Sequence, residues 1–486
     1  MKITEKVRNM IRSWLRIEPA QSSQITINET LDFYGNAIKN SIWYRGKSDE
    51  LTELYRQIPG DRTAFWKASS TAGMEIRKIH TGLPKLIVDV LTSVVMADMQ
   101  DIEMPEQYAD VWENIESENS FKQLVADALK KTLYIGDGAF KISIDTDISQ
   151  YPIIEFVSGD RVEYVYKRGR LCEVIFNTTY VHNHKEYLLK EYYGRGYVNY
   201  SLFYNNKEIN LDFIPQTEGL HKITYEGNWL MAVPVKIYTS DYYEGRGQSI
   251  FDGGRTESFD ALDEAWSQWM YAIRRSRPKE YLPPSMIPKN PHTGENLMPN
   301  AFDNVFISTE GGMPEDGKSE IKLIQPTVPH ESYLSTYITA LDLCLQGLIS
   351  PSTLGIDTKK LDNAEAQREK EKTTLYTRNQ IISVLQEVLP TLIDTVIKVY
   401  STSLEEPTTD IEVDIPFGEY ANPSFESQVE TVGKARMQGI MSVEASVDEL
   451  YGDTKDDDWK KAEVARIKSE QGVVVQDEPA VNADMA

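Results

Sequence analysis

Residues 255–400 constrain the fold of this chain most, because two helical patterns there enclose a segment that cannot be helical. The first pattern predicts a helix over about 256–276, in which apolar side chains recur at steps of three and four residues. These side chains are Phe259, Leu262, Trp266, Trp269 and Ile273. Between Pro278 and His330 no helical period remains, and eight prolines interrupt the segment. The flanking helices would therefore hold this segment at both ends as a rigid projecting module.

A second amphipathic helix is predicted over 330–348, followed by a loop over 349–362. Its apolar face consists of Leu334, Tyr337, Ile338, Leu341, Leu345 and Leu348. The next helix, predicted over 363–400, is the longest in the chain, and its apolar side chains recur about every seven residues. Pro390 lies inside it, so we expect a kink near Gln386, where the helical hydrogen bond is lost.

The chain before this stretch changes character near residue 135. Helices are predicted at 1–16, 28–39, 48–56, 83–99, 108–116 and 120–133. The first is basic and amphipathic, which favours packing on a neighbour in an assembly and leaves a membrane-surface helix as the alternative. After the turn Gly136-Asp137-Gly138, runs rich in tyrosine and valine predict an antiparallel β subdomain. Its strands are predicted at 140–144, 153–157, 162–166, 171–176, 187–193 and 197–204.

The residues after 400 predict smaller elements. Alternating Ile and Val over 411–417 predict a strand. Short helices are predicted at 424–439, 442–451 and 454–471, and the last has acidic residues at its start and basic ones later, as the helix dipole favours. Residues 472–486 carry no pattern, so we expect a disordered tail.

This order of elements resembles the portal protein of tailed bacteriophages, the head-to-tail connector of long-tailed phages. Three short strings support the resemblance: Gly245-Arg246-Gly247-Gln248-Ser249 before the first long helix, Ile349-Ser350-Pro351-Ser352-Thr353-Leu354-Gly355 after the second, and Asn363-Ala364-Glu365-Ala366 at the start of the longest. No single string is a specific fingerprint, and their order and spacing carry most of the weight. The resemblance covers nearly the whole chain.

The resemblance implies an α+β portal fold whose parts follow one another along the sequence. They are a β-rich wing with a helical N-terminal part (1–254), stem helix 1 (255–278), a small α/β clip (279–329), stem helix 2 (330–348), a tunnel loop (349–362), a long kinked helix (363–400), a return strand to the wing (401–420), crown helices (421–471) and a disordered tail (472–486).

The resemblance also implies a function without enzymatic activity. The expected assembly is a homo-oligomeric ring, a dodecamer, at one capsid vertex of the virion, built in the host cytoplasm. Double-stranded DNA would pass through its channel during packaging and ejection, and the ring would nucleate procapsid assembly. The expected protein partners are the terminase large subunit, a head-completion adaptor, tail proteins, and the major capsid and scaffolding proteins. No cofactor, metal or membrane partner is expected.

Three sets of residues become candidate sites. The tunnel-loop set, Asp357, Thr358, Lys359 and Lys360, would approach DNA, and its lysines would touch phosphates or else pair with acids of an adjacent subunit. The basic belt, Arg274, Arg275, Arg277 and Lys279, would line the stem-to-clip junction or simply complement the helix dipole. The stem set, Trp266, Trp269, Ile273, Tyr337 and Leu341, would be buried between subunits or within one chain.

The charge of the chain bears on its contact with DNA. The formal net charge is -24 with a pI near 4.8, which disfavours stable DNA binding over most of the surface. A ring of about twelve copies would carry roughly -290 charges, which suits a channel through which DNA slides. Simple solubility is the alternative reading of this acidity.

Enzyme and metal sites find little support in the sequence. The Gly136-Asp137-Gly138 turn lacks a Walker frame, and no Gly-x-Ser-x-Gly elbow occurs. His182 and His184 could share a strand face and bind a metal, but a polar turn is favoured there. Cys172 and Cys344 are expected to be reduced core thiols, and no apolar run of about 18 residues was found. A phage-encoded hydrolase with a β-rich substrate domain, or a minor capsid or scaffold protein without a channel, remain the alternatives.

Overall fold

The protein has the predicted α+β composition. A computed structural model describes residues 30–58, 63–70, 76–300, 305–308, 322–356, 364–418, 425–451 and 457–470. The chain divides into two compact units, residues 1–97 with 101–415, and residues 98–100 with 416–486. Each unit is described by itself below, and the predicted helix at 1–16 and tail at 472–486 lie outside the described residues.

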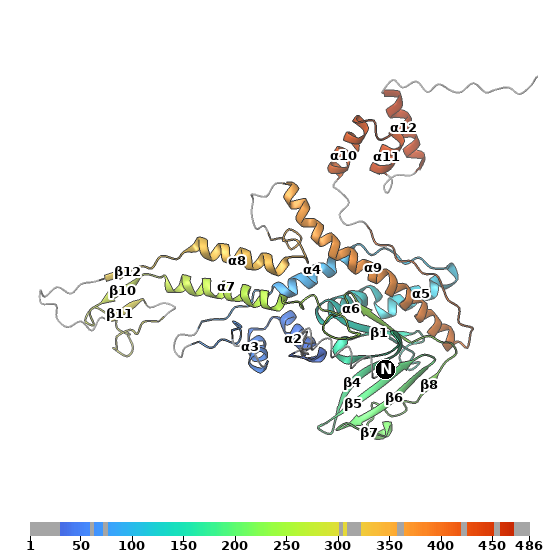
Figure 1. Cartoon of the computed structure of the whole chain (residues 1–486), viewed down its shortest axis with the longest axis horizontal. Coiled ribbons are helices and arrows are strands. Elements are labelled where there is room, and N and C mark those ends of the chain that lie inside the picture. The colour runs from blue at the N-terminus through green and yellow to red at the C-terminus, as the bar shows by residue number, and fades with distance from the viewer. Residues whose placement is uncertain are drawn as a thin grey trace, which may run out of the picture. The chain divides into compact units, whose positions relative to one another are not determined.

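Five helices precede the first strand in the described part of the chain (Figure 1). They are α2 (Phe33–Arg45), α3 (Ser48–Gln57), α4 (Leu83–Ala97), α5 (Glu106–Asn119) and α6 (Phe121–Ile135). The first begins later than the predicted 28–39 because the Asp32 side chain caps it, accepting from the backbone N–H of Gly35 at 2.7 Å. It continues to Arg45 and ends where Gly46 adopts the left-handed conformation.

Two antiparallel sheets form the predicted β subdomain. The smaller has the order β2-β1-β9, from β1 (Asp137–Ser143), β2 (Ile153–Ser158) and β9 (Ala232–Lys236). The larger has the order β3-β4-β5-β6-β7, with β8 (Ile223–Thr224) also on β6. Its other strands are β3 (Val162–Lys167), β4 (Arg170–His182), β5 (Lys185–Gly194), β6 (Tyr197–Tyr204) and β7 (Lys207–Ile209), and two short 3-10 helices, η1 (Gly159–Arg161) and η2 (Leu211–Phe213), interrupt the subdomain. The antiparallel prediction is confirmed, with β4 and β5 longer than the patterns indicated.

The core of the larger unit is organised by α9 (Ala364–Ser403), which packs on β1, β9 and α4. Its residues Leu389, Leu392, Ile393 and Val396 are all completely buried. By length and composition, its part Lys372–Ser403 is apolar enough to cross a membrane, and half of the most apolar window is buried inside the protein. The sequence-based search missed it because Glu387 and Asp394 interrupt the run. The packing identifies it as a core helix.

The helix α9 continues through Pro390 without a break, so the bend itself stays a prediction.

The glycine turn that resembled a phosphate loop has a structural role. The Asp137 carboxylate, 1% exposed, pairs with Arg246 at 2.8 and 2.9 Å, and it also accepts the backbone N–H of Gly247 at 2.7 Å. Arg246 donates further to the carbonyls of Val162 and Gly159 at 2.7 and 2.6 Å. A Cβ atom on Gly247 would lie 2.2 Å from the carbonyl oxygen of Gly136. The two glycine strings are therefore in contact and fix the segment that leads into the first of the two predicted stem helices.

The predicted strand at 411–417, which was to return to the wing, is wrong. The segment alternates in burial, with Ile415 fully buried, but it forms only isolated single-residue bridges, such as Asp414 with Glu103. Pro416 has no backbone N–H to donate to a ladder. The alternation reports one buried side of an extended chain that pairs with residues 98–103 only at isolated positions.

The smaller unit contains the predicted crown helices. They are α10 (Phe425–Met437), α11 (Val443–Tyr451) and α12 (Asp457–Glu470). The Tyr451 and Trp459 rings meet edge to face at 5.1 Å, and Lys460 pairs with Asp448 at 3.0 Å. Val432 and Val447 are buried between these helices.

Candidate functional site: the α7–α8 hairpin

Two long helices lie side by side and carry a small sheet at their shared end (Figure 1). They are α7 (Arg255–Arg275) and α8 (His330–Leu345), which correspond to the two predicted stem helices. The sheet has the order β11-β10-β12, from β10 (Lys279–Leu282), β11 (Phe306–Ser308) and β12 (Lys322–Ile324). β10 is parallel to β11 and antiparallel to β12. The described residues of this module contain no helix, and the expected α/β clip stays a prediction.

Aromatic rings fill the space between the two helices. Trp266 lies 5.8 Å from Trp269 and 5.6 Å from Tyr337, and Trp269 stacks on Tyr333 at 6.3 Å between ring centroids. Leu341 is buried. These predicted stem residues thus already pack within one chain, and burial between subunits stays a prediction for them.

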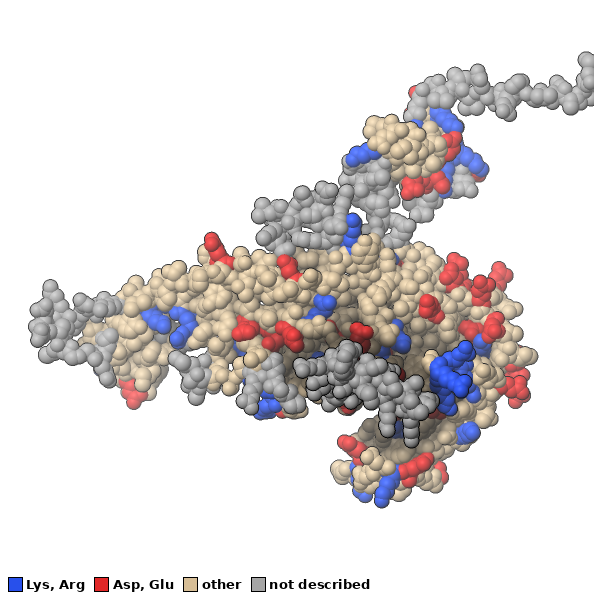
Figure 2. All heavy atoms as spheres, in the orientation of Figure 1, with Lys and Arg blue, Asp and Glu red and all other residues tan. Residues whose placement is uncertain are grey.

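One stretch of each hairpin helix carries no charged side chain. Residues 265–273 of α7 and 332–341 of α8 contain no Asp, Glu, Lys or Arg. Figure 2 shows the corresponding surface as a largely uncharged band. Ile273 and Leu334 are 44% and 45% exposed on it. An uncharged surface with exposed branched side chains, in a chain of net charge -24, is a candidate contact surface.

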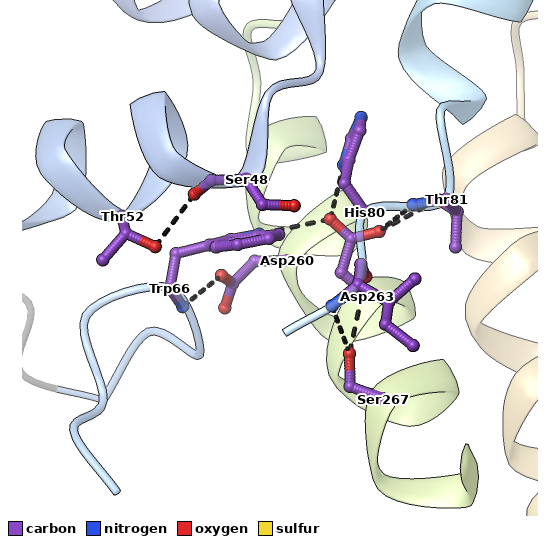
Figure 3. Close-up of polar contacts among 9 residues, drawn as sticks. Ser48, Thr52, Trp66, His80, Thr81, Asp260, Asp263 and Ser267 are labelled. Carbon is purple, nitrogen blue, oxygen red and sulfur yellow. Dashed lines mark hydrogen bonds and ion pairs between the residues drawn. The ribbon is translucent and has the colours of Figure 1, made fainter. Parts of the chain in front are cut away.

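The root of the hairpin is held by a buried carboxylate that the sequence analysis missed (Figure 3). Asp263 is completely buried and accepts from the Trp66 indole at 3.1 Å and from the Thr81 backbone N–H and hydroxyl at 2.8 and 2.9 Å. The His80 Nδ1 atom lies 2.7 Å from the same carboxylate. Four contacts from residues 66–81 thereby fix α7, and Asp263 is an anchor that leaves no oxygen for a ligand.

Asp260 and Ser267 extend this anchor along the same side of α7. Asp260 accepts the backbone N–H groups of Phe65 and Trp66 at 2.8 and 3.1 Å, and the Ser267 hydroxyl accepts from Ile79 at 2.9 Å. Burial raises the pKa of Asp260 to about 6, against these two backbone donors. The one signal in the sequence was three polar residues at steps of three and four beside an apolar stripe.

The basic belt lies where α7 ends and β10 begins. Arg275 lies over the Tyr271 ring at 5.6 Å, and Arg274 and Lys279 are half-buried. Within the described residues, no carboxylate forms an ion pair with Arg274, Arg275 or Lys279. Arg277 is exposed. A DNA-facing role for this belt stays a prediction.

The tunnel-loop residues Asp357, Thr358, Lys359 and Lys360 lie outside the described residues. The start of that loop is described and is tied to α9. The Ser350 backbone N–H donates to the Thr374 hydroxyl at 2.8 Å, and the Thr377 hydroxyl donates to the Leu348 carbonyl at 2.7 Å. The start of the loop, which follows α8, is therefore held against α9.

The other residues considered for metal binding or reactivity have different surroundings from those that such a site needs. Asn183 and His184 form a tight turn with positive φ between β4 and β5, as the polar-turn interpretation predicted. Among the described residues, no group of three or more His, Cys, Asp and Glu side chains is placed to hold a metal ion. Cys344 is fully buried, and burial raises its pKa to about 12. Cys172 is only half-buried on β4, so its prediction as a core thiol is wrong.

Comparison with known proteins finds no matching family model and no matching curated protein. Among solved structures, a chain of the virion of a native gene transfer agent particle is similar, with a TM-score of 0.38 and 11% identity over 85% of this chain and 98% of that chain. A chain from the neck of the native particle, computed with C12 symmetry, has a TM-score of 0.39 and 13% identity over 77% and 91%. Because both scores and identities are low, we base the functional proposal on this chain's own residues.

Proposed function

We propose that this chain is the subunit of a phage portal: a closed ring at one capsid vertex that conducts double-stranded DNA and links head to tail. The observation that carries the proposal is the α7–α8 hairpin with its three-stranded tip, followed by a loop and the 40-residue helix α9. This is the order of stem, clip, stem, tunnel loop and long helix that the resemblance implies.

The uncharged band supports assembly through the hairpins. Trp266, Trp269 and Tyr337 stiffen the hairpin from inside, so its outer side chains are held in place before any partner arrives. Repeating one heterologous contact by rotation closes a ring and brings the band of each copy against the next. The tip sheet then projects from the ring as the docking platform for the terminase and, later, for a head-completion adaptor.

Head assembly tests the conduit function. Heads assembled with this chain should take up DNA when the terminase and its nucleotide are supplied, and heads assembled without it should stay empty. DNA-filled heads in the absence of this chain would contradict the proposal. Added nuclease separates packaged DNA from DNA bound outside the head.

The tunnel lysines provide a second test, of the channel itself. Replacing Lys359 and Lys360 by alanine removes two of the few positive charges proposed to lie near passing DNA. We expect rings to form normally and packaged DNA per head to fall. The matched control is Lys207→Ala, at an exposed position on β7. Normal packaging and retention of DNA by the double variant would end the proposed role of these lysines.

A further inference from the structure

An open cavity with polar and apolar groups in its lining lies where α7 begins, beside the end of α8 and one face of α9. Its volume is about 410 Å³. Four residues of α9 at steps of three and four, Thr373, Tyr376, Thr377 and Gln380, form one wall. The opposite wall comes from the segment that precedes and begins α7 and from the residues that follow α8. These are Tyr238, Gln248, Ser249, Ile250, Asp252, Arg255, Gly347 and Leu348.

Arg255 is the one basic residue in this lining. One of its terminal nitrogens donates to the carbonyls of Cys344 and Gln346 at 2.8 and 3.3 Å. Its Nε atom is buried and has no hydrogen-bond partner among the described residues. No described carboxylate lies within ion-pair distance of it. Burial lowers the pKa of Arg255, as expected for a guanidinium that has lost water without gaining an anion.

The one carboxylate in the lining, Asp252, is already occupied. Its Oδ1 atom accepts from the amides of Asn36 and Asn40 at 2.9 and 3.1 Å, and its Oδ2 atom accepts from the Ser249 backbone N–H at 3.0 Å. These three donors stabilise the carboxylate where it lies and occupy both of its oxygens, which keeps it from pairing with Arg255. The side chains of Gln248, Thr373, Tyr376 and Gln380 make no hydrogen bond to described residues and are available to a ligand.

We propose that this cavity binds one small oxyanion, a phosphate or carboxylate group, through Arg255 and the polar wall of α9. The Nε atom is closed off from the cavity and one terminal nitrogen is engaged by the two carbonyls, so the second terminal nitrogen is the donor left for one oxygen of such a group. Partial burial strengthens this charge-assisted contact. Hydroxyl and amide side chains supply the remaining donors. This site lies apart from the hairpin surface that the portal proposal uses, so the two stand independently.

The experiment is a titration of the full chain with inorganic phosphate at constant ionic strength. Calorimetry measures the binding, and the melting temperature measures the stabilisation that binding gives. We expect saturable binding of one phosphate per chain. Arg255→Lys keeps the charge but cannot hold the Cys344 and Gln346 carbonyls and an anion in the same geometry, so binding should weaken about tenfold. Gln380→Ala removes one exposed donor of the wall and should weaken binding about threefold without disturbing folding. The same series with acetate decides between phosphate and carboxylate as the preferred group.

Arg275→Gln is the matched control, because it removes an exposed arginine at the other end of the same helix. It should bind phosphate as the unaltered chain does. The absence of saturable binding of either anion would overturn the proposal, as would equal binding by the unaltered chain and Gln380→Ala. Equal weakening in Arg275→Gln would show general charge attraction and would overturn it as well. If Arg255→Lys does not fold, the comparison of phosphate binding by Gln380→Ala and by the unaltered chain still tests the proposal.

Discussion

Two buried carboxylates of α7 fix this helix to an earlier part of the chain. Asp260 and Asp263 look like ordinary acids in a chain with 75 acidic residues, and spacing alone cannot separate them from the others. Their partners lie at residues 65–81, nearly 200 positions earlier, and that pairing cannot be read from one sequence. The ion pair of Asp137 with Arg246 could not be read from the sequence either. The two glycine-rich strings that contain these residues were noted, but nothing indicated that they are in contact.

Asp260 predicts a specific dependence of stability on pH. Its folded-state pKa, raised to about 6 from an ordinary 3.8, means that the folded protein binds this proton more tightly. The contribution is fully present below about pH 4 and is lost as the pH rises through 6, by at most about 3 kcal/mol. In Asp260→Asn this part of the slope should vanish. Chemical unfolding at several pH values measures it, and parallel curves for both proteins would contradict the assignment.

The pair of Asp137 and Arg246 predicts a large loss of stability on breaking it. Arg246→Leu leaves a buried carboxylate without its ion pair and should cost about 3–5 kcal/mol of unfolding free energy. Adding Asp137→Asn should recover part of that loss, because the unpaired charge is then gone. Denaturant unfolding of the two single variants and the double variant gives the coupling. A double variant whose loss equals the sum of the two single losses would show that the contact contributes nothing specific.

Helices whose apolar residues recur at regular spacing could be predicted from the sequence. Elements that depend on hydrogen bonds to a distant segment could not. The stripes of α7 and α9 are set by local spacing, and their observed limits agree with the predicted ones within a few residues. The segment 411–417 has the alternation of a strand, but its neighbour at residues 99–103 pairs with it only through isolated bridges. The stem aromatics were predicted on the apolar stripes of their helices, while their pairing with one another needed the hairpin geometry.

The uncharged band of the hairpin predicts an effect on assembly. Ile273→Asp places a charge on a surface that the portal proposal buries between copies, and desolvating an unpaired carboxylate is costly. We expect the variant to stay folded and to fail to form rings in sedimentation. Ile148→Asp is the control, because Ile148 is 75% exposed and lies outside the hairpin. Rings formed equally well by both variants would exclude this surface from the subunit contact.

At the scale of the whole molecule, acidity and architecture fit one account. In the proposed ring, stiff hairpins with an uncharged surface would meet one another, and the acidity of the chain would keep DNA from adhering to the walls. The order of the elements and its resemblance to phage portal proteins led to this account from the sequence. The number of copies and the path of DNA depend on contacts between chains, which no single sequence encodes in readable form.

The mass of the purified full-length protein in solution, measured by native mass spectrometry with particle images of the same sample, tests the central claim most directly. The account predicts closed rings of about twelve subunits with a central hole, formed without any cofactor. A protein that stays a monomer or dimer, with scaffold protein present as well as absent, would contradict it.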